Sequence, residues 1–67
     1  MIQVTVNGEK HALRPNTTVL DLVESLQLTG KRIAVEMNGE IVPKSQHADT
    51  PLTEGAQLEI VVAVGGG

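Results

Sequence analysis

Apolar and polar residues alternate at the start of the chain, as expected for the first of two paired strands. The alternation covers residues 2–6, which is the period-two pattern of a half-buried strand. Asn7-Gly8 follows, and both residues tolerate the positive φ angles of a tight type I′ turn. The returning strand should end by Arg14, because Pro15 has no N–H to donate to a ladder. A two-residue turn would make three pairs: Val6 with Glu9, Val4 with His11 and Ile2 with Leu13. Two of these partners are only partly apolar, so the pattern establishes the hairpin and leaves its register open.

A single short helix is predicted after this hairpin. Thr18 and Asp21 form a capping box, in which the Thr18 hydroxyl accepts from an early backbone N–H and Asp21 reaches back. Gly30 suits a C-terminal cap, and Lys31 and Arg32 would complement the negative end of the helix dipole. A helix this short is marginal alone, so its apolar stripe must pack on the sheet. The stripe has helical spacing and consists of Val19, Leu22, Val23 and Leu26.

Two further strands and a second hairpin are predicted in the middle of the chain. Residues 33–37 alternate again and lead into Asn38-Gly39, the same hairpin signal as before. Ile41-Val42 begins the returning strand, and Pro43 keeps that strand short and at an edge of the sheet. Residues 44–51 show only polar turn chemistry, with room for a single 3₁₀ turn.

The last strand is predicted at residues 58–62, after a turn at residues 53–56. Alternation would direct Glu59, Val61 and Ala63 outward, and Val61 and Ala63 would leave a small apolar surface. The opposite face would point to the core: Leu58, Ile60, Val62 and Val64. Two strands, a helix and two or three further strands indicate an α+β fold, with one helix packed across one face of a mixed sheet of four to five strands.

Three glycines follow the last apolar run. Gly65, Gly66 and Gly67 lose more conformational entropy on ordering than other residues, so stability does not explain them. Without side chains, they can enter a narrow tunnel in another protein. The five residues from Ala63 onward reach about 16–18 Å when extended. The simpler alternative is a frayed end or glycines added for expression. The adjoining apolar strand favours the first interpretation, a tail that carries a carboxylate into another protein's active site.

Composition narrows the classes of function. A chain of 67 residues is one domain, and with no Phe, Tyr or Trp its core must be aliphatic. The lack of cysteine excludes disulfides, thiolate metal sites and thiol nucleophiles. The net charge is −3, and the five basic residues are spread along the sequence, which argues against nucleic-acid binding. The longest apolar run, residues 60–64, is far shorter than the roughly 20 residues of a membrane span. The expected location is the cytoplasm, with no membrane attachment and no signal peptide.

No catalytic or metal-binding group is predicted. Ser45, His47 and Asp49 have the residue types of a catalytic triad, but a triad needs an oriented base and an oxyanion site. One polar turn seldom supplies both, so we interpret these residues as turn formers with a solvated histidine. His11 is interpreted as a half-exposed strand residue, and two isolated histidines do not form a structural metal site.

The whole pattern resembles the ubiquitin-like β-grasp sulfur carriers, and within that family the branch that serves thiamine biosynthesis. The segments that carry the resemblance are Val19-Leu20-Asp21-Leu22-Val23, the stretch from Ile33 to Pro43, and Val64-Gly65-Gly66-Gly67. Ala56 departs from the family, which often has Asp after the turn glycine. The resemblance implies a β-grasp domain over residues 1–64 and a flexible glycine tail over residues 65–67.

The resemblance also implies a reaction cycle run by partner enzymes. An E1-like enzyme would use ATP to adenylate Gly67, and a cysteine desulfurase system would supply sulfur to make a thiocarboxylate there. Thiazole synthase would take that sulfur into the thiazole ring. Gly65 and Gly66 would line the partner's tunnel, and docking would involve Val61, Ala63 and Val64. The chain itself would be a carrier and not an enzyme, with no bound cofactor.

Two alternatives stay open from the sequence. One is a carrier of the same fold that serves molybdopterin synthesis or tRNA thiolation. The other is a β-grasp interaction module with no chemistry at its tail.

Overall fold

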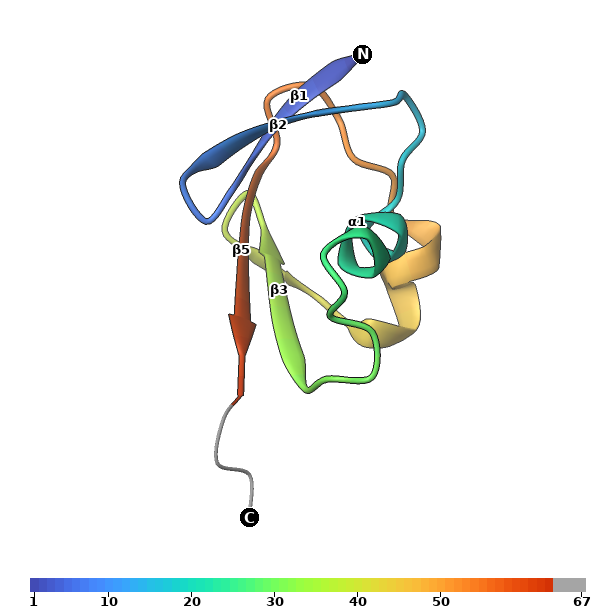
Figure 1. The fold of residues 1–67 in the computed structure, drawn as a ribbon, viewed down its shortest axis with the longest axis vertical. Coiled ribbons are helices and arrows are strands. Elements are labelled where there is room, and N and C mark those ends of the chain that lie inside the picture. Colours follow the sequence, from blue (N-terminus) through green and yellow to red (C-terminus); the bar gives the residue numbers. More distant parts are fainter. Residues whose placement is uncertain (64–67) are drawn as a thin grey trace.

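The computed structural model describes residues 1–63, which form a five-stranded mixed sheet with one α-helix on one face (Figure 1). The fold class predicted from the sequence is therefore confirmed. The elements in chain order are β1 (Ile2–Val6), β2 (Glu9–Leu13), α1 (Val19–Ser25), β3 (Ile33–Met37), β4 (Glu40–Val42), the 3₁₀ helix η1 (Lys44–Asp49) and β5 (Gln57–Val62).

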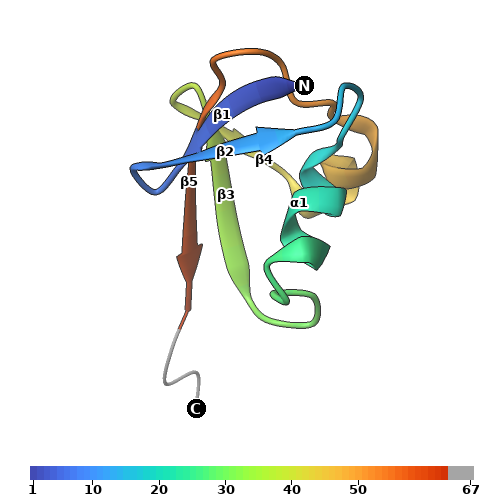
Figure 2. The same cartoon turned by 45° about the horizontal axis from the view of Figure 1, so that its top comes forward.

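The last strand lies in the middle of the sheet. The strand order is β2-β1-β5-β3-β4. β5 runs parallel to β1 and antiparallel to β3, so it joins the N-terminal hairpin to the central one. Figure 2 shows α1 on one side of the sheet only, which leaves the other side open. We call the helix side the inner face and the open side the outer face.

The first hairpin has the register of a two-residue turn, which the sequence pattern leaves open. Val6 pairs with Glu9, Val4 with His11 and Ile2 with Leu13. The turn residues have φ angles of 50° at Asn7 and 85° at Gly8, as a type I′ turn requires. The second hairpin repeats this geometry at Asn38 and Gly39, with φ angles of 53° and 85°. β4 is short and lies at the edge of the sheet, also as predicted.

The helix begins where the sequence predicts. The Thr18 hydroxyl accepts from the Asp21 N–H at 3.1 Å, and Asp21 Oδ2 accepts from the Thr18 N–H at 3.0 Å. The Val19 N–H, which has no acceptor within the helix, donates to the Thr50 carbonyl at 2.9 Å. The helix start is thus fixed both by its own capping box and by the segment after η1.

The predicted C-cap at Gly30 is wrong, because α1 ends at Ser25. The Leu28 N–H donates to the Val23 carbonyl at 3.1 Å and the Gln27 N–H to the Glu24 carbonyl at 3.0 Å, which is the Schellman pattern. Gln27 takes the left-handed position, with φ of 60°. Leu28 packs against the core and favours this early stop. Lys31 and Arg32 therefore lie outside the last turn of the helix.

The interpretation of His47 as a solvated residue is also wrong. Residues 44–49 form a six-residue 3₁₀ helix that contacts α1, where the sequence indicated at most one turn. His47 is only 4% exposed, and its Nε2 lies 3.0 Å from the Val42 carbonyl oxygen. His11, in contrast, is half-buried on β2, as predicted.

The core is aliphatic and lies between the inner face and α1. Leu58 and Ile60 point into it as predicted, whereas Val62 is 36% exposed because β5 extends past the end of the helix (Figure 1). The helices among residues 1–63 all lack the length and hydrophobicity that a bilayer crossing requires. The buried core residues are Val4, Val6, Val19, Leu22, Val23, Val35, Leu52, Ala56, Leu58 and Ile60.

Candidate functional site

The outer face carries exposed apolar residues near the end of β5. Val61 is 59% exposed and lies directly opposite Ala34 of β3. Ile41 of the edge strand β4 is 62% exposed on the same face. Ala63 is exposed immediately after β5. Val61 and Ala63 were predicted to dock a partner, and both are accessible for that role. We call Ala34, Ile41, Val61 and Ala63 the outer patch.

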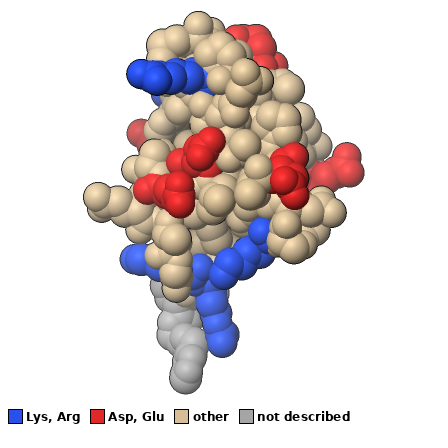
Figure 3. All heavy atoms as spheres, turned by 90° about the vertical axis from the view of Figure 1, so that its right-hand side faces the viewer, with Lys and Arg blue, Asp and Glu red and all other residues tan. Residues whose placement is uncertain are grey.

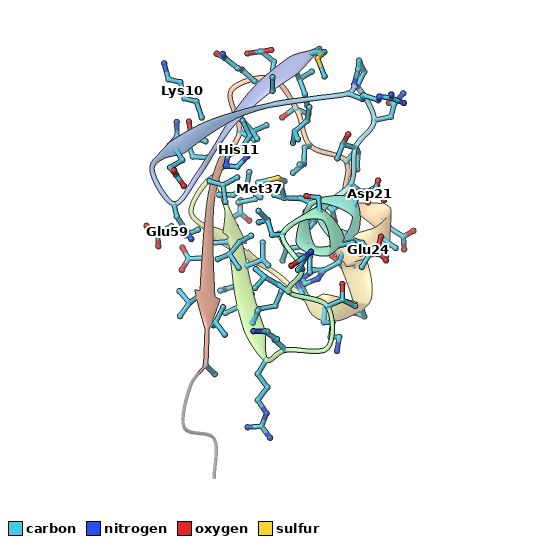
Figure 4. The ribbon with its side chains drawn as sticks, viewed as in Figure 1. Lys10, His11, Asp21, Glu24, Met37 and Glu59 are labelled. Atoms are coloured by element: carbon cyan, nitrogen blue, oxygen red, sulfur yellow. The ribbon has the colours of Figure 1, made fainter. Side chains whose placement is uncertain are left out.

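Acidic side chains lie next to the outer patch. Glu36 of β3 and Glu59 of β5 are direct cross-strand partners, a placement of like charges that weakens a sheet. Figure 4 shows Glu59 projecting away from α1, whereas Asp21 and Glu24 lie on the helix at the other side of the molecule. The outer face therefore presents apolar and negative groups side by side.

The end of β5 is fixed by the neighbouring strand. The Ala63 N–H donates to the Arg32 carbonyl at 2.9 Å, one step beyond the pairing of Val62 with Ile33. The last described residue is therefore held beside β3 by a backbone hydrogen bond. Val64, Gly65, Gly66 and Gly67, to which the sequence assigned docking, tunnel and sulfur-carrying roles, lie outside the described residues.

A groove of about 550 Å³ opens at this same end of the molecule. Its lining runs from the helix and η1 to Val61 and Ala63, and three basic side chains contribute to it: Lys31, Arg32 and Lys44. Figure 3 shows blue side chains gathered at the end of the molecule where β5 ends. The basic residues are spread along the sequence, and the fold brings three of them together.

The triad-like residues do not form a site. Ser45 and Asp49 are exposed on η1, while His47 is buried and bonded to a backbone carbonyl. The His47 side chain thus holds η1 against β4, and the rejection of catalysis by these residues is consistent with the structure.

Known proteins with similar sequences point to one family. The sulfur carrier protein ThiS of Bacillus subtilis is 38% identical over 63 residues, which are 92% of this chain and 96% of that protein. A thiazole synthase of Paramagnetospirillum magneticum is 39% identical over 66 residues, which are 98% of this chain and 20% of that protein. A thiazole synthase of Magnetococcus marinus is 32% identical over 66 residues, which are again 98% of this chain and 20% of that protein. The chain spans about a fifth of the length of these two relatives.

A solved structure agrees with these relatives. The crystal structure of a thiamine biosynthesis protein (ThiS) from Geobacter metallireducens superposes with a TM-score of 0.82 and 26% identity, covering 98% of this chain and 100% of that one. The β-grasp architecture implied by the resemblance is thereby confirmed. The model of the ThiS family matches residues 3–67, nearly the whole sequence. The chain belongs to the ThiS family.

Proposed function

We propose that the chain is the sulfur carrier of thiamine biosynthesis and that Gly67 carries the sulfur as a thiocarboxylate. The observation that carries the proposal is the family match, which extends through the three glycines to residue 67. The relative named sulfur carrier protein ThiS and the solved thiamine biosynthesis protein support the same function. They also favour thiamine over molybdopterin or tRNA thiolation as the pathway served.

The chemistry explains why partner enzymes are needed. A carboxylate is a poor electrophile, so an E1-like enzyme would let the Gly67 carboxylate attack the α-phosphate of ATP and release pyrophosphate. A persulfide from a cysteine desulfurase system would then displace AMP from the acyl carbon. Reduction of the resulting S–S bond by a second thiol would leave the thiocarboxylate and form a disulfide between the two thiols. ATP would be bound by the enzyme and not by the carrier.

The carrier's own contribution is positional. Gly65 and Gly66 would pass through the partner's tunnel as backbone, because a residue without Cβ allows the closest approach. Val61, Ala63 and Val64 would dock the domain beside the tunnel entrance. The exposure of Val61 and the fixed position of Ala63 support this arrangement. No side chain of the carrier would take part in the chemistry, so the chain would act as a protein substrate and not as an enzyme.

Thiazole synthase is the partner best supported by the relatives. Two proteins of that name contain a stretch that matches 98% of this chain and makes up 20% of their own length. A carrier-like segment and a synthase thus occur in one polypeptide there. We accordingly propose that a surface of thiazole synthase receives the tail once Gly67 carries the thiocarboxylate.

The absence of cysteine allows a direct test. The purified chain is incubated with the adenylating enzyme of its own organism, ATP and a sulfur source, and is then treated with a thiol alkylator. Alkylation is needed because a sulfur-for-oxygen exchange weighs nearly the same as oxidation of Met1 or Met37. We expect an adduct on Gly67 by fragment mass spectrometry, and none when ATP is omitted. A chain without Gly66 and Gly67 should stay folded and unmodified. Activation of that truncated chain, or no adduct on the intact one, would contradict the proposal.

A further inference from the structure

The basic residues divide into two groups at opposite ends of the molecule. Of the five Lys and Arg residues, Lys31, Arg32 and Lys44 line the groove beside the end of β5. Lys10 lies on β2 near the other end (Figure 4), and Arg14 follows that strand. The protein is negative as a whole, so the positive charge around the groove is a local concentration.

Among the described residues, the lining of the groove carries positive charge without acidic side chains to offset it. The described residues that line it include no Asp or Glu, and the three basic residues are exposed. Clustered like charges repel one another, and a cleft lined by one sign of charge attracts an oppositely charged ligand. The groove is therefore suited to an anionic occupant.

The floor of the groove is apolar. It includes Val23 of α1, Leu28 after the helix and Ile33 at the start of β3, with Ala48 of η1 exposed at its side. A volume of about 550 Å³ lies in the range of clefts that bind ligands. An occupant that fits both features has apolar side chains flanked by carboxylates.

The groove adjoins the end of β5, the strand that the tail follows in the sequence. Ala34, Val61 and Ala63 line it, and the backbone carbonyl of Arg32 accepts the hydrogen bond from the Ala63 N–H. The groove is thus continuous with the outer patch at Ala34, Val61 and Ala63. A protein that takes up the tail must approach this end of the domain and would cover the groove.

We propose that this groove docks an acidic segment of thiazole synthase, with apolar side chains on the floor and carboxylates facing Lys31, Arg32 and Lys44. This inference rests on the proposed function, because it takes thiazole synthase as the partner. It adds a second contact region on the helix side of the end of β5, separate from the outer patch except at Ala34, Val61 and Ala63.

The distribution of basic residues provides a matched test. The double variants Lys31→Glu/Arg32→Glu and Lys10→Glu/Arg14→Glu change the net charge equally, and only the first pair lies at the groove. The probe is the thiazole synthase of the same organism, with dissociation constants measured by titration calorimetry. At about 0.05 M salt we expect the groove variant to bind roughly tenfold more weakly and the control less than about twofold, and the difference should shrink at about 0.5 M.

A second pair of variants tests the groove with a single charge. Ala48→Glu places a carboxylate beside the cations, where it would compete with the partner's acidic segment. Ala12→Glu adds the same charge to an exposed position of β2. We expect only the first to weaken binding. Thermal unfolding of all four variants establishes that each is folded.

The outcomes separate this inference from the proposed function. Equal binding by groove and control variants would overturn the inference, while sulfur loading of the wild-type chain would still support the carrier function. A groove variant that binds the synthase normally but is no longer adenylated would assign the groove to the adenylating enzyme and also overturn the inference. A wild-type chain that is never loaded would contradict the carrier function itself.

Discussion

The side-chain amide of Asn7 pairs with the backbone of Ile60 in the way that a strand residue would. Asn7 Nδ2 donates to the Ile60 carbonyl at 3.1 Å, and the Ile60 N–H donates to Asn7 Oδ1 at 2.8 Å. These bonds extend the parallel contact of β1 and β5 beyond the pairing of Val6 with Leu58. Asn7 therefore serves both as a turn residue and as a link to the strand that leads to the tail.

Asn7→Asp should destabilise the fold by about 1–2 kcal/mol, because a carboxylate accepts the Ile60 N–H but cannot donate to the Ile60 carbonyl. Asn38→Asp is the matched control. It occupies the same place in the second hairpin, where its side-chain Oδ1 accepts from the Gln57 N–H at 3.0 Å, a bond that a carboxylate can keep. The control should cost less than about 0.5 kcal/mol by urea unfolding near neutral pH. Equal losses of stability in the two variants would show that the substitution acts through the turn and not through the link to Ile60.

Gln27→Gly should stabilise the protein by about 0.5 kcal/mol, because glycine adopts the left-handed position after α1 without the strain of a Cβ. Glu24→Gly, at an exposed site within the helix, should instead cost about 0.5–1 kcal/mol. Opposite shifts in the midpoint of denaturation are the expected result. A loss of stability in both variants would contradict the assigned end of the helix.

His47→Ala should cost about 1–3 kcal/mol, because it empties a buried position and removes the hydrogen bond to Val42. Gln46→Ala, at the exposed neighbouring position, should change the free energy of unfolding by less than about 0.5 kcal/mol. Similar small effects in thermal unfolding of the two variants would mean that His47 does not hold η1 in place.

Val61→Asp should weaken binding of the adenylating enzyme by about tenfold and cost less than about 1 kcal/mol in stability, because the side chain faces solvent. Ile60→Asp is the contrasting variant. It buries a carboxylate in the core and should cost several kcal/mol, enough to unfold much of the protein. Binding and unfolding are measured on the same samples. Unchanged affinity of Val61→Asp would remove the outer patch from the docking surface.

The features that the sequence predicts well are those set by local chemistry. An Asn-Gly pair predicts both hairpins and their turn type, although it leaves the register of the first hairpin open. The capping box of Thr18 and Asp21 locates the helix start, and strict alternation on β5 separates Ile60 from Val61. Each of these signals lies within a few residues of the structure that it specifies.

The features that the sequence missed depend on contacts between distant elements. α1 stops early because Leu28 packs on the core. The left-handed position after the helix is occupied by Gln27 and not by glycine, so the usual sequence sign of a helix end is missing there. His47 is buried by the packing of η1 on α1. Residues 44–49 have no apolar periodicity that would predict this packing. The basic groove forms because Lys44 is brought to Lys31 and Arg32 by the same packing. The roles of Gly65 to Gly67 stay predictions.

The parallel placement of β1 and β5 determines how the domain responds to a mechanical load. β1 begins at the N-terminus and β5 ends at the exit of the tail, at opposite ends of the molecule (Figure 2). A pull on the tail by an enzyme would slide β5 along β1 and strain their hydrogen bonds together, where an antiparallel hairpin pulled from its ends would open one bond at a time. The sheet would therefore resist such a load as one unit.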